Sequence, residues 1–223
     1  MSSFPRMLRS IGVQKSAGGT VDPNGIIPLV RGILELSLKY DFDRIGPAVK
    51  QSVSQHLVGS SAALSSLLRR VRSSCAMPKP PDLQNWSSDA IRDYFKPKRL
   101  SLLQWQESVK RLLALAHEHK IHTMLPGLYF LLLSLHGPAE LAVNTSFSLS
   151  DRARCTTAFP FIHRDICKHH PSSNQDALDH RTLWAFCLLT NNAQEEIWAS
   201  LPSAFKFKNW KQLEYENLNT TLR

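Results

Sequence analysis

Hydrophobic residues recur every three or four positions along most of the chain, which is the spacing of helices that bury one face. Two such stripes follow each other early in the sequence, within residues 27–40 and 45–57. Because a short connection containing Lys-Tyr-Asp joins them, the two predicted helices should pack antiparallel as a hairpin. The apolar positions of the two stripes are Val30, Ile33, Leu34 and Leu38, then Ile45, Val49, Val53 and Leu57.

Further helices are predicted from the same spacing, with prolines and glycines marking their ends. Pro97 is expected to end a short helix, Gly137-Pro138 to stop an apolar one, and Pro160 to kink or divide another. No segment shows sustained alternation, so the predicted fold class is all-α, an irregular multi-helix bundle with no substantial sheet. The expected later helices cover residues 60–72, 88–95, 103–119, 125–136, 182–189 and 192–200, one opening at 150 and one capped by Asn209.

Composition shifts along the chain predict four regions. The first is a basic, disordered N-terminal segment, and the second holds the hairpin and the helix after it. A Pro-rich basic linker with a short helix then leads to a C-terminal helical domain. The expected boundaries are 1–25, 26–72, 73–100 and 101–223.

The most apolar run, residues 124–135, is far shorter than the roughly 20 residues that span a bilayer, so it is predicted to be a buried helix. No signal-peptide core precedes it. The four cysteines are widely spaced, which indicates reduced thiols. We therefore expect an intracellular protein, cytoplasmic or nuclear, with no membrane partner.

The net charge of +9 is concentrated in one region, because residues 61–100 carry eight basic and three acidic side chains. Such a basic patch could attract nucleic acid or an acidic protein, although it could also be a solvated helix end and linker. No DNA-recognition helix and no pattern of aromatic residues for base stacking accompanies the charges. The candidate basic patch comprises Arg69, Arg70, Arg72, Lys96, Lys98 and Arg99.

No residue pattern indicates a reaction. His163, Cys167 and His170 share a helical face and could be drawn as a zinc site with Cys155 or His169, but the paired ligand spacing of structural zinc sites is missing. The cysteines have apolar neighbours, which raises a thiol pKa rather than lowering it. We expect no catalytic residue, no metal, no cofactor, no small-molecule substrate and no enzyme activity.

Aromatic residues are the remaining candidates for function. The five tryptophans are spread one per segment, as in a helical core, but Trp86 and Trp210 adjoin polar loops and could anchor a partner. Tyr40 is a third candidate for partner binding. Its ring is expected to wedge between the two hairpin helices, with its hydroxyl near the surface.

The stretch ILELSLKYDFDRIGPAVKQSVSQHL, residues 33–57, resembles the last helical hairpin of a BTB/POZ domain, although Gly46-Pro47 departs from that pattern. HTMLPGLYFLL, the Arg154-Cys155 pair and IWASLPSAFKFKNWKQLE are similar to the helical region after the BTB fold in mushroom-type fungal proteins. The matching hairpin residues are Leu34, Leu38, Lys39, Tyr40, Asp41, Ile45 and Leu57.

This resemblance implies a non-enzymatic protein–protein interaction module, an adaptor or scaffold in transcriptional regulation or protein turnover. Its partners would be other proteins or a second copy of the chain. Residues 1–26 are too few for the sheet-bearing half that precedes the hairpin in the family, so sheet-mediated dimerisation is not expected. The uncovered hairpin stripe should dock partly on the C-terminal helices and partly on another chain. The alternative is nucleic-acid binding through residues 61–100.

Overall fold

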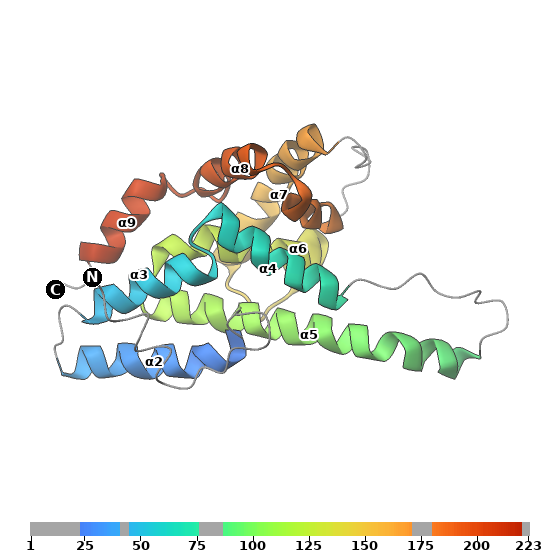
Figure 1. The fold of residues 1–223 in the computed structure, drawn as a ribbon, viewed down its shortest axis with the longest axis horizontal. Helices are drawn as coiled ribbons and strands as arrows, with labels where there is room; N and C mark the ends of the chain where they lie inside the picture. The colour runs from blue at the N-terminus through green and yellow to red at the C-terminus, as the bar shows by residue number, and fades with distance from the viewer. Residues whose placement is uncertain (1–22, 41–44, 76–86, 171–179, 220–223) are drawn as a thin grey trace.

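The computed structural model describes residues 23–40, 45–75, 87–170 and 180–219, and all regular structure within these residues is helical (Figure 1). The predicted all-α class is therefore confirmed. The elements are α2 (Pro23–Lys39), α3 (Ile45–Leu57), α4 (Ser61–Cys75), α5 (Ser88–Glu118), η2 (His122–Met124), α6 (Leu125–Val143), α7 (Leu149–His169), η3 (His180–Leu188), α8 (Asn191–Ala204) and α9 (Trp210–Asn219). None of these helices is long and apolar enough to cross a membrane.

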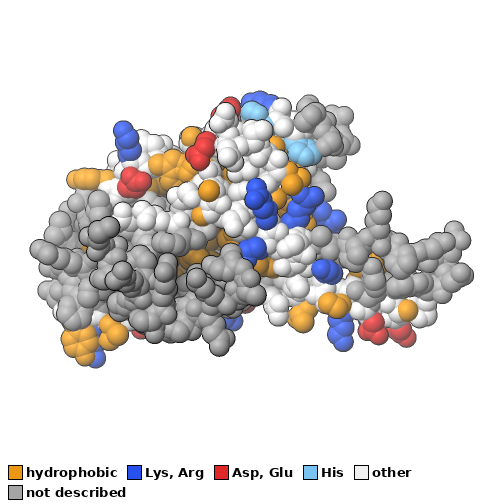
Figure 2. Space-filling view, viewed as in Figure 1, with side chains coloured by type: hydrophobic (Ala, Val, Ile, Leu, Met, Phe, Trp, Pro, Cys, Tyr) orange, Lys and Arg blue, Asp and Glu red, His pale blue; other side chains and the backbone are white. Residues whose placement is uncertain are grey.

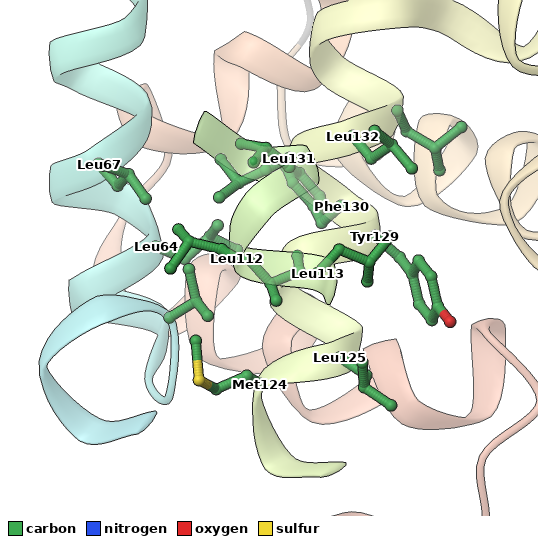
Figure 3. Packing of buried hydrophobic residues seen from close by; sticks show 14 of the residues in the cluster. Leu64, Leu67, Leu112, Leu113, Met124, Leu125, Tyr129, Phe130, Leu131 and Leu132 are labelled. Carbon is green, nitrogen blue, oxygen red and sulfur yellow. The ribbon is translucent and has the colours of Figure 1, made fainter. Parts of the chain in front are cut away.

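Helix α6 is the centre of the core. All its residues from Leu125 to Leu135 are buried, because it is apolar on every side and contacts α5, α7, η3 and α8. Figure 3 shows Leu64 and Leu67 of α4 directed towards Leu112, Leu113 and the leucines of α6. The prediction of a buried helix here is confirmed.

The predicted hairpin forms, with α2 and α3 lying side by side and antiparallel (Figure 1). Leu34, Val49 and Val53 are 1%, 0% and 7% exposed, so the described part of the hairpin stripe is covered within the chain. Helix α2 also contacts α5, and α3 contacts α4 and α9. The side chains of Leu38 and Ile45 lie outside the described residues.

The expected position of Tyr40 is wrong. Its side chain is 57% exposed, and its ring lies 5.5 Å from Lys39 Nζ rather than between the helices. Tyr40 follows the last residue of α2, and its backbone N–H donates to Leu36 O at 3.0 Å. The aliphatic side chains already fill the hairpin interface, so the ring stays at its end.

The bounds of several helices also differ from the expectation. Pro97 does not end a helix, because α5 continues through it for 31 residues, and the expected boundary at residue 100 falls inside α5. Ser87 caps α5, since its Oγ accepts a hydrogen bond from Ala90 N. Pro160 does not divide α7, which runs from Leu149 to His169. Residues 182–188 of the helix expected over 182–189 lie in the 3-10 helix η3 rather than in an α-helix.

Gly137 interrupts α6 as expected, although a further helical turn follows it. Its φ of 73° and ψ of 160° lie in a region that essentially only glycine adopts. A Cβ atom there would also lie 2.9 Å from His180 Nδ1. The position therefore requires glycine both for its backbone conformation and for the close approach of η3.

We expect Gly137→Ala to lower the free energy of unfolding by about 1–3 kcal/mol. Gly32→Ala in α2 is the matched control, because a Cβ there meets no atom within 4 Å and alanine favours a helix by about 0.5–1 kcal/mol. Urea unfolding of both variants checks the prediction. Equal stabilities would show that the Gly137 conformation costs nothing.

Candidate interaction surface

Helices α4 and α5 bring the predicted basic patch together. The Arg70 guanidinium lies 6.0 Å from the Trp105 ring centroid, and the charge of Lys98 acts on the buried thiol of Cys75. Because 70 pairs with 105 and 75 with 98, the two helices run antiparallel here. Figure 2 shows Lys and Arg side chains gathered around this region, over α4 and the adjoining part of α5.

The basic residues of this patch divide into two groups. Arg69 and Arg70 hold neighbouring elements, since Arg69 Nε donates to Cys187 O at 3.3 Å and Arg70 lies over Trp105. Lys98 is half-buried towards α4. Arg72, Lys96 and Arg99 are exposed. Arg69 is exposed as well, but a substitution there would remove its hydrogen bond to Cys187 O. Arg72, Lys96 and Arg99 are therefore the basic residues best placed to meet a partner without disturbing the fold.

Burial raises the pKa of the Cys75 thiol, and the charge of Lys98 lowers it by a smaller amount. The net upward shift keeps this thiol protonated near neutral pH. A thiol with a raised pKa is a weak nucleophile near neutral pH.

Sequence reasoning missed the exposed leucines of α5. Leu100 and Leu103 are 55% and 52% exposed, and they lie on the same helix as Lys96 and Arg99. Their helical spacing was visible in the sequence, but the expected break at Pro97 divided the pattern. The continuous helix places apolar and basic side chains on one surface.

Trp210, one of the predicted partner anchors, is half-buried against α8. Its ring stacks on Trp198 with centroids 4.4 Å apart, and its Nε1 donates to Trp198 O at 3.1 Å. It also lines a pocket of about 260 Å³ between α3 and α9, with Lys50, Ser54 and Glu214. Burial, and then the charge of Lys120, lower the pKa of Lys50. The core interpretation holds for the tryptophans of the described residues, which are buried in or packed against the core, while Trp86 lies outside those residues.

The zinc hypothesis brings only two side chains together. Cys167 Sγ lies 3.7 Å from His163 Nδ1, and both residues are buried in α7. Among the residues that the structure describes, no group of three or more His, Cys, Asp or Glu side chains could hold a metal ion.

A partly buried polar cluster that sequence reasoning missed joins α5, α6 and α7, with Tyr129 and Asp151 buried. Tyr129 OH donates to Asp151 Oδ1 at 2.5 Å, and Ser148 Oγ donates to Asp151 Oδ2 at 2.7 Å. His117 Nε2 lies 3.3 Å from Asp151 Oδ1. The Tyr129 ring stacks on Phe207 with centroids 6.1 Å apart. No local sequence pattern predicts this cluster, because its members are contributed by α5, by α6 and by the start of α7.

The titration of this cluster suits a structural role. Burial raises the pKa of Asp151, but hydrogen bonds from His117, Tyr129 and Ser148 together outweigh it and hold that pKa at about 2. Burial, and then the hydrogen bond to Asp151, raise the pKa of Tyr129 far above its usual range. Burial and then the charge of Asp151 likewise raise the pKa of the Cys155 thiol. A carboxylate and a phenol fixed in these states are poor proton donors and acceptors near neutral pH.

Comparison with known proteins found no matching family model, no matching characterised protein and no matching solved structure. The resemblance to the BTB/POZ hairpin therefore stays a prediction.

We expect Asp151→Asn to remove a pH-dependent share of stability. Because the folded pKa of about 2 lies below the ordinary 3.8, ionised Asp151 stabilises the fold fully above pH 3.8 and less as pH falls through 2. The shift corresponds to about 2 kcal/mol at neutral pH. Urea unfolding from pH 6 to pH 2.5 should show the difference between wild type and variant shrinking in acid. A difference that stays constant with pH would contradict this account.

Proposed function

We propose that the chain is a non-enzymatic protein–protein interaction module, a BTB-related adaptor or scaffold of the kind that serves transcriptional regulation or protein turnover. The observation that carries the proposal is the exposed half of α5. No described residue from Ser88 to Glu107 is buried, whereas six of the next nine residues are. A helix that leaves the core in this way, with Leu100 and Leu103 on its surface, presents a binding face.

The antiparallel α2–α3 hairpin supports the BTB-related part of the proposal. It is the element with which the family's fold ends, and in this chain its described stripe is covered by neighbouring helices. The hairpin therefore contributes to the core, and α5 carries the partner. Tyr40 is exposed at the end of the hairpin and stays a candidate for a second contact.

The second candidate function is nucleic-acid binding. Helix α4 and residues 94–106 both carry basic residues, and neither stretch contains an acidic residue. Phosphate binding requires closely spaced exposed cations. Here Arg69 and Arg70 contact Cys187 and Trp105. The exposed leucines Leu100 and Leu103 lie on the same stretch of α5 as Lys96 and Arg99, so the exposed surface there is partly apolar. This arrangement favours a protein partner.

Two measurements on the purified full chain test the proposal. Fluorescence anisotropy with single- and double-stranded oligonucleotides should show weak binding that disappears at about 150 mM salt. Affinity capture from the source cells, followed by titration with each purified captured protein, should give saturable binding by at least one. The opposite result would be tight oligonucleotide binding at that salt that the triple variant Arg72→Ala/Lys96→Ala/Arg99→Ala loses. If, in addition, no captured protein binds saturably, the chain binds nucleic acid instead.

A further inference from the structure

The exposed half of α5 carries one continuous stripe, which we call the α5 stripe. Residues 92, 96, 99 and 103 are separated by four, three and four positions and so share a helical face, and residue 100 adjoins this face. Every member is exposed. The α5 stripe consists of Arg92, Lys96, Arg99, Leu100 and Leu103.

The α5 stripe faces away from the body of the protein. The neighbouring face, with Lys98, Leu102 and Trp105 at spacings of four and three, is the one turned to α4 and the core. Figure 1 shows this half of α5 extending past the ends of the other labelled helices. The part of the chain that the structure describes therefore leaves the α5 stripe uncovered.

The charges of the α5 stripe are not neutralised within the described residues. Lys96 and Arg99 form no ion pair with any residue in the described ranges, and only Arg92 does, with Asp89 at 3.1 Å. No acidic residue occurs between Asp93 and Glu107 or anywhere in α4. A complementary partner must bring carboxylates.

The leucines define the rest of the partner. Leu100 and Leu103 lie between and beside the cations, so a complementary surface needs apolar side chains flanked by acidic ones. Because the leucines lie on one face of a helix, another helix is the best match for them. Its apolar residues at i, i+3 and i+4 would pack against Leu100 and Leu103. A second copy of the α5 stripe would place cations opposite cations, which opposes self-pairing.

We propose that the α5 stripe binds an acidic, leucine-bearing amphipathic helix of a partner protein. This inference rests on the proposed function, since it names the chemistry of the partner that the interaction module takes. With two leucines and three cations, the contact is small, reversible and strongly weakened by salt.

The test uses the full chain and a labelled synthetic helical peptide with leucines on one face and glutamates on the other. A peptide of the same composition in scrambled order is the control for charge alone. Anisotropy titrations should show saturable binding of the amphipathic peptide and at least about tenfold weaker binding of the scrambled one. Raising the salt from 50 to 300 mM should weaken binding several-fold.

Two double variants locate the site. Lys96→Glu/Arg99→Glu and Leu100→Ala/Leu103→Ala should each weaken peptide binding about tenfold or more. Lys208→Glu/Lys211→Glu, which makes the same charge change at exposed residues near α9, should stay within about twofold of wild type. Circular dichroism and thermal melting confirm that each variant is folded. Because the substituted residues are exposed, loss of folding is not the expected result.

Other outcomes overturn the inference. The inference is wrong if the amphipathic peptide does not bind or if the scrambled peptide binds equally well. It is also wrong if only the charge variant weakens peptide binding, or if duplex DNA of equal charge displaces the peptide. If the peptide fails while a purified partner still binds and the α5 variants do not weaken that binding, the interaction function stands and the α5 stripe is not its site. If no purified protein binds, the proposed function itself fails.

Discussion

The fold depends on the burial of one helix, α6, which offers no polar face to solvent from Leu125 to Leu135. A helix of this kind is stable in water only when other helices surround it, and α5, α7, η3 and α8 do so. Each of these elements therefore has an apolar face directed at α6. The rest of the chain is arranged around that requirement. Helix α4 packs against α5, η3 and α8, and its Leu64, Leu67 and Leu68 are buried.

The polar cluster at Asp151 is a consequence of the same arrangement. Because α6 must be covered on every side, Tyr129 is carried into the interior, where its hydroxyl needs a partner. Asp151 lies in the first turn of α7, where the helix dipole and the Ser148 hydroxyl already favour its charge. The resulting contact resembles a catalytic arrangement in its residue types. Its hydrogen bonds link α6 to the first turn of α7, and the shifted pKa values favour an ionised carboxylate beside a neutral phenol.

The sequence predicts the features that follow from apolar periodicity. It does not predict those that depend on contacts between residues far apart in the chain. The hairpin and the buried α6 both follow from apolar spacing and are confirmed. The end expected at Pro97 was wrong because the local rule ignores the cap at Ser87 and the contact of Arg70 with Trp105. Tyr40 was misplaced because spacing does not tell which side chain fills an interface. The basic residues were found, but their division into structural and exposed groups needed the α4–α5 contacts.

Helix α5 connects the core around α6 with the exposed α5 stripe. Its second half is fixed by Val109, Leu112 and Ala116, which are nearly inaccessible, so the direction of the first half is set by the core. That first half contains Pro97, which removes a helical hydrogen bond, and it has few apolar contacts of its own. Local stability should therefore fall along α5 from Glu118 towards Ser88. A partner helix that covers Leu100 and Leu103 would supply the missing burial where α5 is weakest, and would leave the core around α6 unchanged.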